Sequence, residues 1–98
     1  MKQFYMIEFD LPQVYINEIT NRFTEQQKQI DIMISKGIIK SYSLAQNHSK
    51  LWIITSADSE FGIMEIISKL PLSDFMIPSI MPLKFNKSNQ NLRELALN

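Results

Sequence analysis

The sequence predicts an α+β domain whose strands and helices follow the order β-α-β-β-α-β. Three observations support this: two segments place apolar residues at helical spacing, four segments are rich in strand-forming residues, and turn-forming residues separate them. The chain has 98 residues, the length of one domain, and its hydrophobic fraction of 45% is typical of a globular protein. We expect one domain over residues 1–85, followed by a C-terminal tail or arm over residues 86–98.

Residues 3–10 are expected to form the first strand because aromatic and other strand-favouring residues are frequent there. Side chains alternate between the two faces of a strand, so one face holds Tyr5, Ile7 and Phe9. The opposite face holds Phe4, Met6, Glu8 and Asp10. Both faces begin with apolar residues, which predicts a sheet that is covered on both sides.

Residues 14–36 are expected to form a long helix, since their apolar residues recur close to every 3.6 positions. This apolar stripe consists of Ile16, Ile19, Phe23, Ile30, Met33 and Ile34. Gly37 follows at the position that often ends a helix. Thr24 and Gln27 have the spacing of a capping box, so an interruption of the helix near Thr24 remains open.

Residues 38–46 and 50–56 are expected to form an antiparallel hairpin, because turn-forming residues separate two strand-like segments. The turn consists of Asn47, His48 and Ser49. His48 is the only histidine of the chain. We interpret it as a solvated turn residue rather than a general base.

The second helix is expected to begin at Asp58 or Ser59, since either side chain is a good N-cap. Its apolar stripe consists of Ile63, Ile66, Ile67 and Leu70. Residues 75–84 then form the last strand. Pro78 and Pro82 have no backbone N–H to donate, so we expect this strand at an edge or a bend of the sheet.

This order of elements is that of the ferredoxin-like fold, a four-stranded antiparallel sheet with two helices on one face. The helices leave the second apolar face without cover. We therefore expect a second copy of the chain to pack its sheet there, in a homodimer or higher homo-oligomer. Three leucines of the C-terminal arm suggest docking on the partner subunit, and a frayed terminus is the alternative. They are Leu92, Leu95 and Leu97.

Composition excludes several classes of function. Ten basic and ten acidic residues give zero net charge, which argues against nucleic-acid binding. The absence of cysteine excludes a disulfide framework, a thiolate nucleophile and a thiolate metal site. No spacing of histidine and carboxylate residues suggests a metal. The N-terminus lacks the apolar segment of a signal peptide or membrane span, so we expect a cytoplasmic protein.

The segment Leu70-Pro71-Leu72, the pair Phe75-Met76 and the pair Pro82-Leu83 resemble the ending of the muconolactone isomerase family. In that family a Leu-Pro-Leu turn leads into an aromatic-Met pair and a closing strand. Weaker matches extend the resemblance over residues 3–85, at Asp10, Gly37 and Asp58-Ser59. The resemblance implies a dimeric α/β barrel, often assembled into larger rings.

The chain departs from this family where the family's chemistry lies. Family isomerases carry a basic residue on the first strand, and this chain has Glu8 there. They place bulky polar and aromatic groups on the second strand, near the positions of Ser41 and Ser43. The family's substrate is an anionic lactone, which a buried glutamate would repel. The resemblance therefore implies the fold and not the substrate.

Glu8 is the candidate catalytic residue, because an apolar barrel interior would raise its pKa toward neutrality. The alternative is a glutamate at the barrel mouth that pairs with a lysine. The candidate substrate-binding residues are Ser41, Tyr42 and Ser43, which would orient a ligand, and Trp52 and Phe75, which would form walls. These residues suggest an isomerase that moves a proton on a small cyclic or aromatic-derived metabolite without cofactor or metal. The alternative function is a non-catalytic small-ligand-binding or assembly module on the same scaffold.

Overall fold

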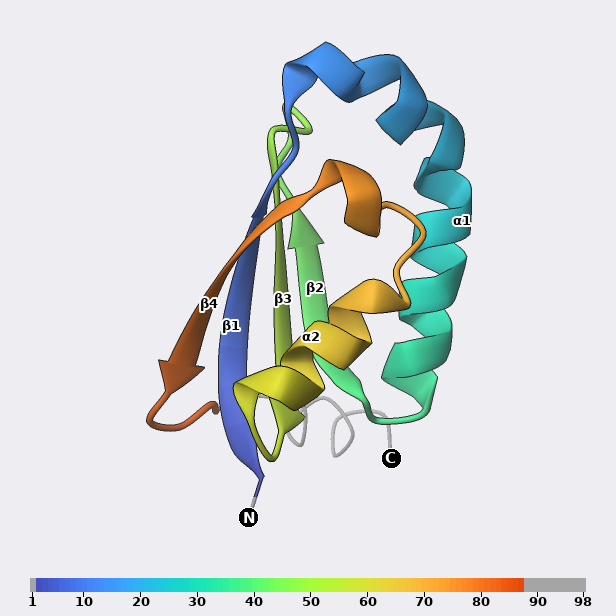
Figure 1. Cartoon of the computed structure of the whole chain (residues 1–98). Helices are drawn as coiled ribbons and strands as arrows, with labels where there is room; N and C mark the ends of the chain where they lie inside the picture. The colour runs from blue at the N-terminus through green and yellow to red at the C-terminus, as the bar shows by residue number, and fades with distance from the viewer. Residues whose placement is uncertain (1, 88–98) are drawn as a thin grey trace, which may run out of the picture.

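The computed structural model describes residues 2–87 and contains one sheet and two helices in the predicted order (Figure 1). Its main elements are β1 Gln3–Asp10, α1 Ile16–Ser35, β2 Ile39–Leu44, β3 Lys50–Ala57, α2 Glu60–Ser68 and β4 Ile77–Leu83. Two short 3₁₀ helices, η1 Gln13–Tyr15 and η2 Ser73–Phe75, precede α1 and β4. The three leucines of the expected C-terminal arm lie outside the described residues.

The sheet has the strand order β2-β3-β1-β4, and all neighbouring strands are antiparallel. This arrangement confirms the ferredoxin-like α+β prediction. β1 lies between β3 and β4 and pairs with both of them along nearly its whole length. β4 forms one edge of the sheet, as Pro78 and Pro82 predicted.

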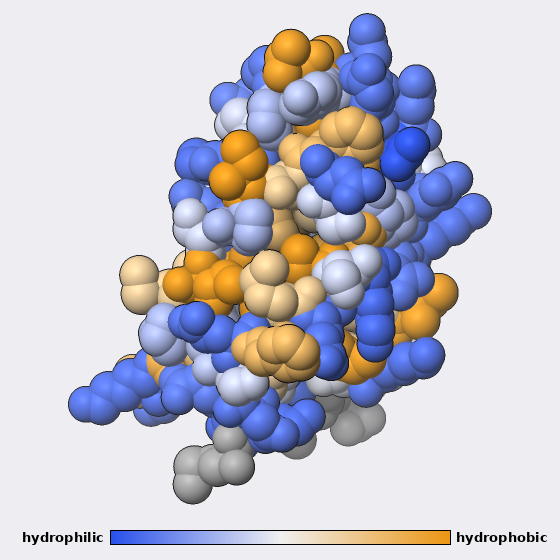
Figure 2. All heavy atoms as spheres, in the orientation of Figure 1, coloured by the Kyte–Doolittle hydropathy of each residue, from blue (hydrophilic) through white to orange (hydrophobic). Residues whose placement is uncertain are grey.

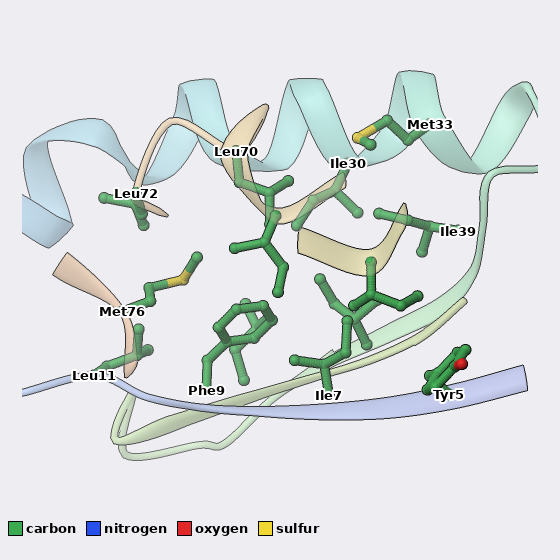
Figure 3. Packing of buried hydrophobic residues seen from close by; sticks show 14 of the residues in the cluster. Tyr5, Ile7, Phe9, Leu11, Ile30, Met33, Ile39, Leu70, Leu72 and Met76 are labelled. Atoms are coloured by element: carbon green, nitrogen blue, oxygen red, sulfur yellow. The ribbon is translucent and has the colours of Figure 1, made fainter. Parts of the chain in front are cut away.

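The helices cover the face of β1 that carries Tyr5, Ile7 and Phe9. All three side chains are buried and point toward α1 and α2 (Figure 3). α1 contributes Ile30 and Met33 to the same core. The remaining members of the core are Leu11, Ile19, Ile39, Leu51, Ile53, Ala57, Ile63, Ile67, Leu70, Leu72 and Met76. The core therefore forms a single layer between the helices and one face of the sheet.

α1 is one continuous helix, as predicted, so the interruption that Thr24 and Gln27 left open does not occur. Those residues lie in the helix interior, where backbone N–H groups already bind the carbonyls four residues earlier. The expected end at Gly37 is confirmed, since Gly37 has a φ of 77°. Its N–H donates to the Ile34 carbonyl and the N–H of Ile38 donates to the Met33 carbonyl, both at 2.9 Å. These are the two bonds of a Schellman motif, which glycine permits at little steric cost.

The N-cap of α2 is Ser59, one of the two residues predicted for that position. The Ser59 hydroxyl accepts a hydrogen bond from the Gly62 N–H at 3.3 Å. Apolar side chains also reach the surface around α2 (Figure 2), where Phe61 and Met64 are exposed. In residues 2–87 we find no helix with the length and apolar character that crossing a membrane requires.

The last strand begins later than predicted, at Ile77 instead of residue 75. The chain first makes tight turns, in which the Ser73 N–H donates to the Leu70 carbonyl and the Phe75 N–H to the Leu72 carbonyl. Phe75 therefore belongs to η2 and not to a strand. Turn hydrogen bonds outweigh the strand preference of an aromatic residue here.

Gln26 connects α1 to this turn, a contact that the sequence did not reveal. Its side chain is fully buried in the middle of α1. Its Oε1 accepts a hydrogen bond from the Leu72 N–H at 3.0 Å, and its Nε2 lies 3.8 Å from the Met76 Sδ. A buried amide needs such partners, because an unpaired buried polar group is costly. Gln26 thereby holds the Leu-Pro-Leu segment against the core.

Replacement of Gln26 by leucine should destabilise the protein by about 1–3 kcal/mol, because the Leu72 N–H would lose its acceptor. Chemical denaturation followed by circular dichroism measures this loss. Gln27→Leu is the matched control, since Gln27 is exposed on the same helix and should change the unfolding free energy by less than about 0.5 kcal/mol. Equal stability of the two variants would contradict the role of Gln26.

Candidate functional site

The face of the sheet opposite the helices is not covered within the described chain, and we call it the open face. Strand pairing assigns its members. β1 contributes Phe4, Met6, Glu8 and Asp10. β3 contributes Lys50, Trp52, Ile54 and Ser56. β2 contributes Ser41 and Ser43, and β4 contributes Ile77, Ser79, Met81 and Leu83. The open face therefore combines apolar side chains with four serines and has one charged corner.

The charged corner is built by direct pairing of β1 with β3. Glu8 lies opposite Trp52, and Asp10 lies opposite Lys50. The Trp52 Nε1–H donates a hydrogen bond to Glu8 Oε1 at 2.9 Å. The Lys50 Nζ lies 3.1 Å from Glu8 Oε2 and 2.8 Å from Asp10 Oδ1. Both oxygens of the Glu8 carboxylate are thus held by residues of β3.

These contacts lower the pKa of Glu8 below its ordinary value of 4.5. The hydrogen bond from Trp52 has the largest effect, followed by the hydrogen bond and charge of Lys50. In the single chain the pKa of Glu8 is thus lowered and not raised, because β3 places two donors beside a carboxylate that stays 43% exposed. The hydrogen bond from Lys50 to Asp10, followed by its hydrogen bond to Glu8, raises the pKa of Lys50. The structure contains the alternative arrangement, in which the glutamate pairs with a lysine, here Lys50.

A hollow of about 330 Å³ lies on the open face beside this corner. It is lined by Met6, Ser41, Ser43, Trp52 and Ile54. Trp52 belongs to both features, since it lines the hollow and also donates to Glu8. Apolar walls with a few polar groups, at a volume near 300 Å³ or more, are typical of small-molecule sites.

Four of the six predicted site residues share the open face: Glu8, Ser41, Ser43 and Trp52. Tyr42 does not, since it pairs with the buried Ile53 and packs against the core on the helix side. Burial raises the pKa of its phenol, with a smaller effect from Asp31. Phe75 also lies elsewhere, where its ring contacts Tyr15 and Arg22. The roles of the other four residues remain predictions.

Lys50 and Ile54 belong to the site and were not among the candidate residues. Both follow from the alternation that places Lys50, Trp52 and Ile54 on one side of β3. His48 lies in the exposed hairpin turn with a φ of 60°, and its ring meets the edge of Phe23. Over residues 2–87 no group of three histidine or carboxylate side chains is arranged to hold a metal ion.

Comparison with known proteins supports the fold and leaves the family open. No known protein family and no curated protein matches the sequence. A solved structure that is similar is 5-chloro-2-hydroxyhydroquinone dehydrochlorinase of Burkholderia phenoliruptrix, in complex with 2,5-dihydroxybenzoquinone. Its TM-score is 0.66 at 7% identity, over 89% of this chain and 97% of that one. That protein is an enzyme that acts on a small molecule, and membership of this chain in the muconolactone isomerase family is not shown.

Trp52→Phe should raise the pKa of Glu8, because it removes the hydrogen bond with the largest effect on the ionised carboxylate. Lys50→Met should raise this pKa as well. Carboxyl-detected NMR titration of wild type and both variants measures the change. The pKa of Glu8 is lowered in the folded state, so its carboxylate stabilises the fold above pH 4.5 and this contribution is lost as the pH falls through the folded-state pKa. An unchanged pKa in both variants would contradict the assigned contacts.

Proposed function

We propose that the chain binds a small cyclic or aromatic-derived molecule on the open face and moves a proton on it without a cofactor. One observation supports this most directly: an ionised carboxylate, Glu8, is held in place by Trp52 beside a hollow of small-molecule size. A fixed base next to an apolar pocket is the arrangement that general-base catalysis requires. The similarity in fold to a small-molecule enzyme is compatible with it.

In this proposal Glu8 takes a proton from a carbon next to a carbonyl group and returns it at another carbon. The Ser41 and Ser43 hydroxyls, which line the hollow, donate hydrogen bonds to the carbonyl oxygen as negative charge develops there. The Trp52 ring and the side chains of Met6 and Ile54 provide the apolar walls. The lowered pKa makes Glu8 a weak base in water, and exclusion of water from the site strengthens it.

We propose that a second copy of the chain supplies this exclusion of water. Apolar side chains on the open face reach the surface, with Ile77 at 58% and Met81 at 63% exposure. Two open faces packed together would bury them in an interface of roughly 1,200–2,000 Å² or more. Pro78 and Pro82 have no backbone N–H to donate at the β4 edge, which disfavours a dimer formed by pairing of two edge strands. We therefore propose that the two sheets pack face to face. This homodimer would be a dimeric α/β barrel.

The second candidate function is a non-catalytic small-ligand-binding or assembly module on the same scaffold. The lowered pKa of Glu8 and its pairing with Lys50 favour it, because both reduce the basicity of the carboxylate. In this case Glu8 would orient a ligand or a partner subunit without moving a proton.

Met81→Lys should dissociate the proposed dimer, because it places a charge among the apolar side chains that the interface would bury. Light scattering coupled to size-exclusion chromatography measures the mass. Val14→Lys is the control, since Val14 is also exposed, lies on η1 and should leave the assembly intact. A monomeric wild-type protein, or a Met81→Lys variant with wild-type mass, would refute the face-to-face dimer.

Glu8→Gln should reduce proton transfer by roughly 100-fold or more, because it removes the base and keeps the shape of the side chain. Exchange of carbon-bound protons into heavy water, followed by NMR on a panel of unsaturated lactones, measures this activity. Asp10→Asn is the control, since it removes the other carboxylate of the same corner. Wild-type exchange rates in the Glu8→Gln variant would sink the assignment. Ligand binding without exchange in the wild type would favour the non-catalytic module.

A further inference from the structure

We infer that the open-face site selects neutral, hydroxylated ring compounds and discriminates against anionic ones. This inference rests on the proposed small-molecule site and specifies its ligand class. The observation behind it is the balance of charges and hydrogen-bond donors among the open-face residues, which differs from what an anionic ligand requires.

The open face carries an excess of one negative charge among its described members. Its charged residues are two carboxylates, Glu8 and Asp10, and one ammonium, Lys50. Two negative charges and one positive charge leave a formal balance of −1 at neutral pH. Lys40 on the neighbouring strand β2 donates to the Gly37 carbonyl at 3.1 Å.

The strong donors at the charged corner are already used by the protein. The Lys50 ammonium contacts both carboxylates, and the indole N–H of Trp52 donates to Glu8. An anion that took Lys50 as its partner would leave two carboxylates less compensated a few ångströms away. Like charges a few ångströms apart repel, so each less compensated carboxylate disfavours the bound anion. The site therefore penalises a carboxylate or phosphate ligand.

The corner offers acceptors instead. A carboxylate has about four lone-pair sites, and Glu8 receives two hydrogen bonds from the protein. The remaining sites favour a ligand that donates, such as a phenol, an enol or an alcohol. The Ser41 and Ser43 hydroxyls can donate to or accept from a ring substituent on the other side of the hollow.

The rest of the hollow favours a flat apolar body. The Trp52 indole and the side chains of Met6 and Ile54 provide apolar contact. Rings stack on aromatic surfaces, and thioethers adapt to them. An apolar ring with at least one hydroxyl group, and without a negative charge, satisfies each of these features.

The test uses two probes of similar shape at neutral pH, 4-hydroxybenzyl alcohol and 4-hydroxybenzoate, which differ in the charge of one substituent. Titration calorimetry gives both affinities, and the indole N–H signal of Trp52 reports whether the probe binds at this site, because the chain has one tryptophan. We expect the neutral probe to bind about 10-fold more tightly or better, a difference of roughly 1.4 kcal/mol. Added salt should narrow this difference, since screening weakens the repulsion.

Glu8→Gln should bring the two affinities within roughly threefold of each other, because the corner then has no excess charge. Glu25→Gln is the matched control: it removes the same charge from an exposed position on α1 and should preserve the full discrimination. The salt series on the wild type provides an independent readout if the Glu8 variant does not fold.

Equal or tighter binding of 4-hydroxybenzoate by the wild type, with a shift of the Trp52 signal, would overturn the inferred ligand class and leave the proposed site standing. Preservation of the discrimination in a folded Glu8→Gln variant would overturn it as well. If neither probe shifts the Trp52 signal or releases heat, the open face is not a site for small rings. The inference and the proposed function then fail together.

Discussion

The structure depends on the pairing of β1 with a neighbouring strand on each side. β3 and β4 pair with β1 along nearly its whole length. A shift of this pairing by one residue would therefore move every β1 side chain to the opposite face of the sheet. Tyr5, Ile7 and Phe9 must face the helices, so Glu8 must face away from them. Burial of the core and position of the candidate base are thus consequences of one register.

The same register determines the electrostatics of the site. An isolated glutamate among apolar residues would have a raised pKa, but β3 places the Trp52 N–H and the Lys50 ammonium within hydrogen-bonding distance of Glu8. The carboxylate therefore stays ionised, and its corner of the open face becomes rich in acceptors. Similarity in fold to an enzyme at 7% identity does not determine whether such a carboxylate is ionised, because that depends on the individual side chains around it.

Most of the fold could be predicted because its signals are local. Helical periodicity marked both helices, Gly37 marked the end of the first, and two prolines marked β4 as an edge strand. Two kinds of contact escaped prediction: local turn hydrogen bonds and contacts between distant residues. The hydrogen bonds of two tight turns removed Phe75 from the last strand. Gln26 appeared as one more polar residue of α1, although it holds the Leu72 N–H 46 positions later.

The sequence by itself determined the order of the elements, the faces of β1 and the inclusion of Glu8, Ser41, Ser43 and Trp52 among the candidates. These follow from side-chain alternation and helical period, which act over a few neighbouring residues. Only the tertiary structure decided that Tyr42 and Trp52 lie on opposite faces, that Lys50 pairs with Glu8, and that the pKa of Glu8 falls. The physical reason is that strand register and the contacts across it join residues about 40 positions apart, and no local pattern encodes that alignment.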